Sequence, residues 1–344
     1  MNTLRATATL PMSSSLSGRF RRALLGISTG ATRTERRGFR VAVPAVGERL
    51  ERIGTTFAAG YHAALVDPRA EPLADRLHAE VPAGWRGFAF EGAGMGLALV
   101  DFLASLGPGR RPSRLAELLE GPGHRHRYLV AVGAGWTLAR LPRRTAPLLA
   151  SLEPQLRWLA LDGYGFHHGY FGWRRAVVRQ HRPGRLAGPG AAYVRRAFDQ
   201  GLGRSLWFVE GADPQRIAGR IAAFPAARRG DLWSGVGLAC AYAGGLEAEG
   251  VGRLRTLADG WAGDLAQGAA FAAKARIDGG EAVPHLDTAC TVLCGRPGAA
   301  AAALTTRLER ELDARPDEPL EVAVPLYEDW RRRVRDVLAA EETR

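Results

Sequence analysis

A short glycine motif recurs along this chain and constrains its possible folds more than any other sequence feature. The motif is a glycine, any residue, often a second small residue, and then an apolar stretch with helical spacing. Its first glycines are Gly54, Gly92, Gly133, Gly163, Gly201, Gly235 and Gly268. Neighbouring copies are 30 to 41 residues apart, which is the length of a helix-turn-helix repeat. The spacing predicts a run of helical hairpins, each started by a glycine, with a degenerate further copy at residues 287–290.

A glycine inside a helix costs about 1 kcal/mol relative to alanine, so seven such positions need a compensating reason. One reason is close packing of two helices, because no Cβ stands between their backbones. Another is close approach of a ligand to the backbone. Chance recurrence is the third reading, since the chain contains 43 glycines. We expect close helix packing at these positions.

Conventional amphipathic helices are expected between the glycine motifs. One is marked by apolar residues at three- to four-residue spacing and its multiples, namely Val46, Leu50, Ile53, Phe57 and Leu65. Ser113 is expected to cap a helix over residues 114–120 that Gly121 ends. Asp213 followed by Pro214 predicts another helix start, and that helix is expected to bury Ile217, Ile221 and Phe224 before Pro225 stops it.

Signals for β-strands are weak and are limited to residues 40–43 and 321–324. Residues 180–190 are rich in proline and glycine and predict a loop near the middle of the chain, without requiring a domain boundary. Residues 299–312 and 326–340 are expected to close the chain as two helices with charged outer faces, as capping repeats require.

These patterns predict an all-α fold built from helical-hairpin repeats. Residues 1–18 are expected to form a flexible N-terminus, and residues 19–344 a single helical-repeat domain. An array of helical pairs either stays open as an α/α solenoid or closes as an α/α toroid, and the sequence does not choose between them.

The net charge of +12 comes almost entirely from arginine, because Lys274 is the only lysine. Arginine binds phosphate and carboxylate groups in bidentate geometry, so a basic patch for an anionic ligand or a membrane surface is one reading. Compositional bias, seen also in the many glycines and alanines, is the other. The arginines are spread along the chain and no nucleic-acid-binding motif is present, so we expect no nucleic-acid partner.

An odd number of cysteines, three in 344 residues, argues against a disulfide framework and fits a reducing compartment. No apolar stretch of signal-peptide length follows Arg5. The best candidates for a membrane span are residues 88–106, which Glu91 and Asp101 interrupt, and residues 232–246, which are too few. We therefore expect a cytoplasmic protein that can also lie against a membrane surface.

The densest cluster of polar and aromatic residues surrounds His167 and His168. Adjacent residues on a helix point about 100° apart, so the two imidazoles are not expected to bind one metal ion together. One of them could act as a base, with Asp162 orienting the imidazole or capping the helix. Three aromatic residues of the same segment are candidate ligand contacts: Tyr164, Phe166 and Tyr170. The alternative reading is a buried, hydrogen-bonded structural cluster.

A second segment carries Arg204 and Trp207 just after a glycine pair. A helix start there would place backbone N–H groups beside the guanidinium and favour a carboxylate or phosphate. An internal ion pair of Asp199 with Arg196 or Arg204 is the competing interpretation.

A third segment contains Asp231 and Trp233. Asp231 is interpreted first as a helix N-cap, and otherwise as a ligand contact. Trp233 is expected either to line a pocket or to fill the core.

Two further sets of residues could carry chemistry. Cys290 and Cys294 lie one helical turn apart, and His285 precedes them, but a fourth ligand is missing and buried cysteine is common in cores. We therefore assign no metal. Lys274 is expected to face solvent, with a role as a nucleophilic or basic lysine as the alternative.

Several catalytic signatures are absent from the sequence: the G-x-S-x-G elbow, the phosphate-binding P-loop, the H-E-x-x-H zinc motif and the acidic cluster that binds diphosphate through metal ions. The glycine pairs resemble dinucleotide-binding glycines only loosely, because no strand precedes them. The cofactor is therefore left unknown.

Four long blocks resemble a known group of proteins. They cover residues 20–26 with 34–39, residues 162–171, residues 196–208 and residues 229–245. Together they are similar to an actinobacterial family encoded in enediyne biosynthetic gene clusters, from about residue 18 to the C-terminus. The chain departs from that pattern at residues 30–37, which affects only the N-terminal register.

The resemblance implies a pathway more than a reaction. Members of that family are encoded beside two partner proteins, one of them membrane-embedded. The three proteins are implicated in converting the linear polyene of an enediyne polyketide synthase into a diyne intermediate. No catalytic residues are carried over from the family.

Three hypotheses follow. In the first, the chain binds the polyene in a long apolar groove and acts with its partners, which supply the oxidant. In the second, it is a stand-alone α/α-toroid enzyme that acts on a polyene or an isoprenoid. In the third, it is a non-catalytic scaffold that docks the membrane partner through its arginines.

Overall fold

The computed structural model describes residues 16–106, 113–141, 145–184, 191–312, 318–319, 322 and 324–342. Throughout these residues the secondary structure is helical, and no strand occurs among them, so the all-α prediction is confirmed. Residues 40–43, which were weakly strand-like, are extended without forming a strand. Parts of three predicted segments lie outside the described residues: residues 1–15 of the N-terminus, residues 185–190 of the mid-chain loop, and residues 321 and 323 of the second strand.

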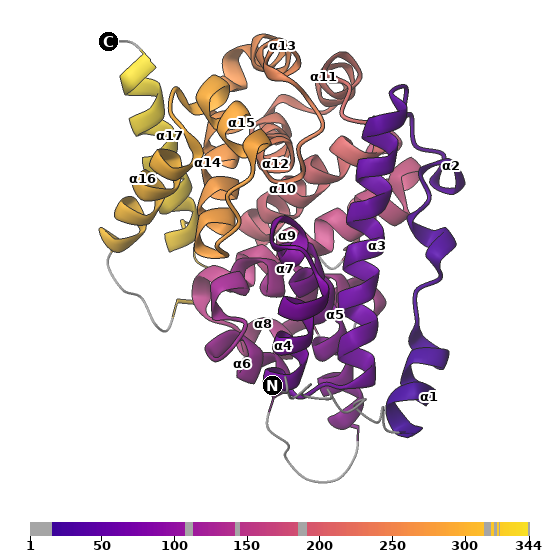
Figure 1. Ribbon diagram of the computed structural model, residues 1–344. Helices are drawn as coiled ribbons and strands as arrows, with labels where there is room; N and C mark the ends of the chain where they lie inside the picture. The colour runs from indigo at the N-terminus through magenta and orange to yellow at the C-terminus, as the bar shows by residue number, and fades with distance from the viewer. Residues whose placement is uncertain are drawn as a thin grey trace, which may run out of the picture.

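Seven long helices form the main row of the molecule: α3 (Pro44–Val66), α5 (Arg86–Ala104), α7 (Arg127–Arg140), α9 (Pro154–Phe171), α10 (Ala191–Val209), α12 (Ala226–Ala243) and α14 (Ala262–Asp278). Each helix packs against the next one in this order. Figure 1 shows the row running from α3 on one side of the molecule towards α14 on the other.

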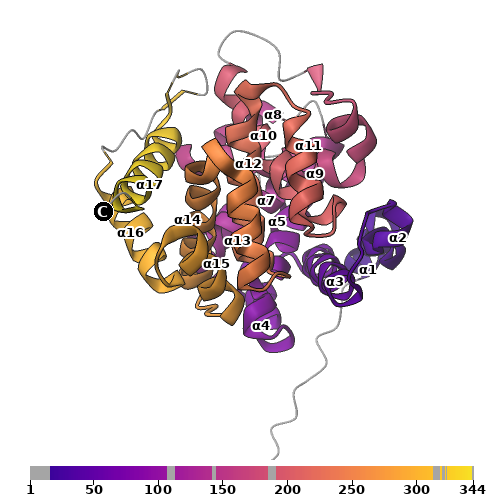
Figure 2. The same ribbon diagram turned by 90° about the horizontal axis from the view of Figure 1, so that it is seen from above.

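Shorter helices connect the members of this row: α4 (Ala70–Glu80), α6 (Arg114–Glu120), α8 (Thr145–Ala150), α11 (Pro214–Ala222) and α13 (Ala248–Ala258). A further short helix, α15 (Pro284–Cys294), follows α14. Among these short helices, α11 packs on α13 and α13 on α15, so they form a second row of their own, at the top of the view in Figure 1. The chain begins with α1 (Leu16–Leu25) and α2 (Thr34–Arg37) and closes with α16 (Gly298–Arg310) and α17 (Leu326–Glu342), which lie at the opposite side from α1 in Figure 2.

The glycines hold the long helices together in reciprocal pairs. A Cβ added to Gly165 would lie 2.0 Å from the carbonyl oxygen of Phe198, and one added to Gly201 would lie 1.7 Å from that of Asp162. Any side chain there would collide with the neighbouring backbone. The same reciprocal contact occurs at six successive crossings, made by Gly60 with Gly92, Gly94 with Gly133, Gly135 with Gly163, Gly165 with Gly201, Gly203 with Gly235, and Gly237 with Gly268.

We call these six crossings the glycine ladder. The prediction of close helix packing is confirmed, but two details of it were wrong. The glycines lie in the middle of the long helices and do not start them. Gly54 faces Thr32 and is outside the ladder, where Gly60 takes its place. The degenerate copy at residues 287–290 belongs to the short helix α15.

The predicted helix signals are otherwise borne out. The hydroxyl of Ser113 accepts a hydrogen bond from the backbone N–H of Ala116 at the start of α6, and the carboxylate of Asp213 accepts one from Arg216 at the start of α11. The five apolar residues expected to be buried on α3 and the three expected after Pro214 all lie in the core.

One helix among the described residues is long and apolar enough to cross a membrane by length and composition, over Ala83–Ala104, with a mean hydropathy of 1.4. The window is 78% buried inside the protein. This segment contains α5, which packs between α3 and α7 and contributes the second helix of the glycine ladder.

Candidate functional site

The residue before the first glycine of each ladder motif is usually polar, and it is buried. Five members show this pattern: Glu91, Asp162, Gln200, Ser234 and Gln267. Two hydrogen bonds join neighbours among them, because Gln200 Nε2 donates to Asp162 Oδ2 at 2.9 Å and Ser234 Oγ donates to Gln267 Oε1 at 2.8 Å. The ladder thus places a row of polar groups inside an otherwise apolar array.

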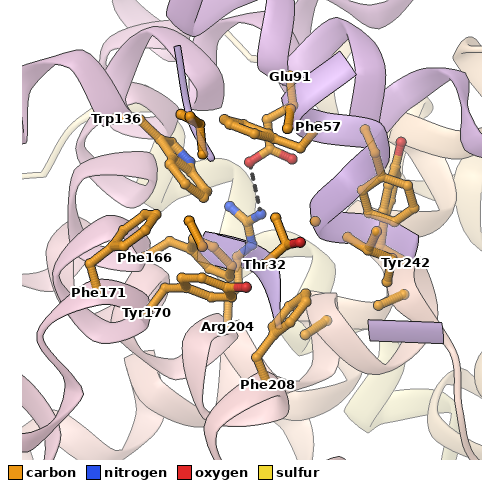
Figure 3. A pocket seen from close by; sticks show the side chains of 18 of the residues that line it. Thr32, Phe57, Glu91, Trp136, Phe166, Tyr170, Phe171, Arg204, Phe208 and Tyr242 are labelled. Atoms are coloured by element: carbon orange, nitrogen blue, oxygen red, sulfur yellow. Dashed lines mark ion pairs between the residues drawn. The ribbon is translucent and has the colours of Figure 1, made fainter. Parts of the chain in front are cut away.

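Arg204 joins two members of this polar row. It lies one turn after Gly201 on α10, and its Nη1 forms a close ion pair with Asp162 Oδ1. Its Nη2 lies 3.6 Å from Glu91 Oε1. Figure 3 shows the guanidinium directed towards Glu91, with aromatic side chains on all sides. One buried cation therefore serves two buried carboxyl groups from α5 and α9.

A cavity lies against this ion pair, and most of its wall is apolar. Eight aromatic side chains line it: Phe57, Phe88, Trp136, Phe166, Tyr170, Phe171, Phe208 and Tyr242. Among the described residues that line it, Glu91 and Arg204 alone are charged. We call it the aromatic cavity. An apolar cavity with few polar groups is the usual organisation of a small-molecule site.

The aromatic cavity is crowded. Its volume is only about 50 Å³, which is room for a few water molecules. The stacked rings of Phe57 and Trp136, 4.2 Å apart, account for part of this crowding. A larger ligand must therefore displace aromatic side chains as it enters.

A second cavity meets the first at Arg204. Leu238 and Tyr242 also line both cavities, so these three residues form the partition between them. The second cavity is likewise mostly apolar, and its far wall comes from α14 and α17, with Phe271 and Trp330 among its residues. The interior of the array therefore contains two apolar compartments with a buried ion pair between them.

The carboxyl group of Glu91 has a strongly shifted pKa. Burial raises the pKa of its carboxyl group to about 7, Asp162 adds to the rise, and Arg204 opposes it. The side chain is 4% exposed. A carboxyl group with a pKa near neutrality can both accept and donate a proton, as general acid–base chemistry requires.

Asp162 faces the same guanidinium from α9. Burial raises its pKa, while the charge of Arg204 and the hydrogen bonds from Arg204 and Gln200 act against the rise. The closer ion pair belongs to Asp162, so Arg204 favours the charged form of Asp162 more strongly than that of Glu91.

The predicted histidine site is arranged differently from expectation. Both oxygens of Asp162 are bonded to Gln200 and Arg204, so this carboxylate orients the guanidinium and not an imidazole. Asp162 is also in the middle of α9 and caps no helix. His167 packs against Phe171, with ring centroids 4.7 Å apart, and burial lowers its pKa to about 3. His168 packs against Tyr164 at 4.6 Å.

Three of the predicted ligand contacts reach the aromatic cavity, namely Phe166, Tyr170 and Arg204. The others do not line either compartment. Tyr164 packs beside His168, and the indole N–H of Trp207 donates to the carbonyl oxygen of Gly244 at 3.0 Å. Trp233 is buried in the core.

Asp231 was expected to be a helix N-cap, but α12 begins five residues earlier. Its carboxylate is buried and pairs with Arg196 at 3.0 Å and with Arg331 of α17 at 2.9 Å. Asp231 therefore fastens the last helix to the row.

Two other predictions from this region were also wrong. Arg204 lies well inside α10, far from a helix start. Asp199 pairs with Arg182 and Arg228 and not with Arg196 or Arg204. The glycine pair causes the first error, because it resembles a helix start but stands inside a helix. The second arises because Arg182 and Arg228 are distant from Asp199 in the sequence.

The two cysteines and the histidine of the possible metal site have structural partners. Cys290 and Cys294 lie on α15 and face the backbone of α14, whereas His285 contacts Arg49 and the carbonyl oxygen of Tyr242. The described part of the chain holds no group of three or more residues suited to bind a metal ion.

Lys274 was expected to face solvent, but it does not. It is buried beside the second cavity, and its ammonium group pairs with Asp278 at 2.9 Å and Glu309 at 3.2 Å. Both neighbouring carboxylates compensate its charge, which explains how the only lysine is accommodated in the interior.

Sequence reasoning missed Glu91 as a site residue. The available signal was its repeat position: Glu91, Asp162 and Gln200 all stand directly before a ladder glycine. A single carboxylate in the middle of the apolar stretch of residues 87–100 was a second signal.

The fold and the site together define an all-α helical-array protein with an internal aromatic cavity and a buried acid–base group. The chain belongs to the family described as "Protein of unknown function (DUF1702)", whose model matches residues 16–338. No curated protein and no solved structure matches the chain.

Proposed function

We propose that this protein binds an elongated apolar molecule in the aromatic cavity and holds it beside Glu91 and Arg204. The observation that carries the proposal is the cavity wall itself, with eight aromatic side chains and a single ion pair. Aromatic faces bind flat, conjugated molecules over a large contact area. The charged pair would fix the position of such a ligand along the cavity.

The ligand we propose is the linear polyene of an enediyne polyketide synthase, in keeping with the sequence resemblance. A long polyene suits two adjoining apolar compartments better than a compact ligand does, and to span both it would displace the side chains that separate them. Two further proteins of the same cassette, one of them membrane-embedded, would be its partners in forming the diyne intermediate.

Forming an alkyne from a polyene removes both electrons and protons. Glu91, with its pKa of about 7, can take a proton at neutral pH. We assign the electrons to an oxidant supplied by a partner. This division makes the chain a substrate-presenting and proton-accepting subunit of an oxidative system.

The first experiment titrates the purified protein with the linear polyene and follows the polyene absorption bands, with the spectrum and metal content of the protein recorded beforehand. Binding is expected to shift the bands and to quench the fluorescence of Trp136. Absence of any shift at saturating concentrations would refute the assignment of the ligand.

A matched pair of variants locates the binding site. Ala239 lines the aromatic cavity, whereas Ala227 is exposed on the same helix, α12. Ala239→Leu is expected to weaken polyene binding at least tenfold, and Ala227→Leu to leave it unchanged, with both proteins remaining helical by circular dichroism. Equal binding by the two variants would place the ligand elsewhere.

A stand-alone acid–base enzyme is the second candidate, and the raised pKa of Glu91 is the observation that favours it. Glu91→Gln keeps the shape of the side chain but cannot accept a proton. Turnover of a polyene or isoprenoid by the isolated protein, lost in Glu91→Gln with binding intact, would establish this reading in place of the partner-dependent one.

A further inference from the structure

The first described helix exposes an apolar stripe to solvent. Leu16, Phe20 and Leu24 on α1 are 84%, 68% and 70% exposed. They are four residues apart, and at 100° per residue each is displaced by only about 40° from the one before it. The three side chains therefore form one continuous face, which we call the α1 stripe.

The opposite face of α1 is fastened to α3. A Cβ on Gly18 would lie 2.1 Å from the carbonyl oxygen of Val66, so the two backbones touch. Arg21 Nε donates to the carbonyl oxygen of Leu65 at 2.9 Å, and Tyr61 donates to that of Leu25 at 2.8 Å. The helix is thus held with its apolar stripe turned outward, at the edge of the molecule beside α3 in Figure 1.

Arginines border the stripe. Arg19 and Arg22 are both exposed on α1. By helical geometry Arg19 is about 60° from Leu16, at the edge of the stripe, whereas Arg22 is about 120° from Leu16, further round the helix. With Arg76 of α4 they line a shallow hollow in the surface, together with Ala23 and Val66. Arg76 also pairs with Glu80 at 3.0 Å. Three guanidinium groups thus lie around one hollow, and guanidinium groups match phosphate groups in charge and geometry.

We propose that α1 docks the protein onto a membrane surface rich in anionic lipids, with the α1 stripe in the acyl boundary and the arginine hollow on the phosphate headgroups. An apolar face bordered by arginines is the pattern of helices that lie in the membrane interface, and anionic lipids attract such cations. The positive charge of the hollow favours an anionic lipid surface as the partner, because a purely apolar protein groove would leave these arginines without counter-charges. This proposal is independent of the ligand in the aromatic cavity.

The test is co-sedimentation of the full chain with sucrose-loaded vesicles of phosphatidylglycerol and phosphatidylcholine, and with vesicles of phosphatidylcholine alone. Binding to the anionic vesicles is expected, and it should weaken as salt rises. The variant Leu16→Gln, Phe20→Gln, Leu24→Gln is expected to bind at least tenfold more weakly. Because these side chains are exposed, the variant should keep the thermal unfolding temperature of the wild type.

Two controls separate the contributions. Val178→Gln removes a half-exposed apolar side chain outside α1 and is expected to bind like the wild type. Arg19→Glu with Arg22→Glu is expected to lose binding to anionic vesicles while keeping the weak binding to neutral ones. Cavity-ligand binding in solution, measured with the same variants, should not change.

Three outcomes would overturn the proposal. The first is equal vesicle binding by the wild type and the stripe variant. The second is a wild type that ignores lipid vesicles but binds a reconstituted membrane protein through the stripe, which would make it a protein-docking surface. The third is a wild-type dimer in light scattering that the stripe variant converts to a monomer, which would assign the stripe to a second copy of the chain.

Discussion

Glu91 shows at the scale of a single residue how a helical array can hold a titrating group near neutrality. Its carboxyl group is surrounded by aromatic side chains and shares Arg204 with Asp162. The closer pairing with Asp162 leaves Glu91 with less compensation for the loss of water. Its pKa therefore rises instead of falling, even though a guanidinium lies 3.6 Å away.

This rise has a measurable effect on stability. The folded state holds the proton of Glu91 up to a pH of about 7, against an ordinary value of 4.5, so the contribution of this group to stability is lost as the pH rises through that window. The shift corresponds to roughly 3 kcal/mol at about 1.4 kcal/mol per unit. Glu91→Gln, which mimics the protonated form, should match the wild type at pH 5 in urea unfolding and exceed it at pH 8. A constant difference at both pH values would contradict the assignment.

Removing the shared cation should have the opposite effect. Arg204→Met leaves two buried carboxyl groups without their cation, and breaking a buried ion pair typically costs about 3–5 kcal/mol. The loss in the free energy of unfolding should be larger at pH 8 than at pH 5, because at pH 5 both carboxyl groups can bind protons. Arg76→Met, which removes the surface pair with Glu80, is the control and should cost less than about 1 kcal/mol.

At the scale of elements, the glycine ladder sets how close the long helices lie. Each crossing has one glycine from either helix, so the two backbones touch without a side chain between them. The separation of the helices therefore does not depend on how side chains interlock at the crossing point.

A pair of glycine substitutions tests the ladder. Gly163→Ala places a Cβ 1.9 Å from the carbonyl oxygen of Val132, and such overpacking typically costs about 1–3 kcal/mol or more. Gly219 lies on α11 with nothing within 4 Å of its added Cβ, so Gly219→Ala should stabilise the protein by up to about 1 kcal/mol. The free energies of unfolding of both variants, measured in urea, test this prediction. Stabilisation by both would show that the ladder contact is loose.

The elements differ in how far the sequence could predict them. The caps at Ser113 and Asp213 were found because a cap is a local hydrogen bond between neighbouring residues. The place of the glycines within their helices was not, since it depends on which backbone lies opposite. Lys274 and Asp231 were assigned to the surface and to a cap for a similar reason: the partners that compensate their charges, such as Glu309 and Arg331, are distant in the sequence.

On the scale of the whole molecule, contacts run mainly between successive members of the row, as in repeat proteins. The last helix, α17, is an exception because Arg331 reaches back to Asp231 on α12 and to Gln267 on α14. The second cavity lies under this helix and takes part of its wall from Tyr327 and Trp330. The closing helix therefore also completes a compartment.

This arrangement predicts that a destabilising substitution affects mainly the helices near it. Arg331→Met should accelerate amide hydrogen exchange in α12, α14 and α17 much more than in α3 and α5, because the lost contacts all lie at one end of the row. Exchange measured by mass spectrometry on peptide fragments reports each helix separately. A uniform acceleration over all helices would show that the array unfolds as a single cooperative unit.

The ladder glycines press against main-chain carbonyl groups, which every amino acid carries. Each contact therefore constrains one position strictly and leaves the residue opposite free to change. In descent from a common ancestor, the side chains that face the interior can be exchanged one at a time while the frame that positions them keeps its dimensions. In a scaffold of this kind the helix arrangement and the ligand selectivity can evolve separately. Relatives with the same glycines can therefore bind different ligands.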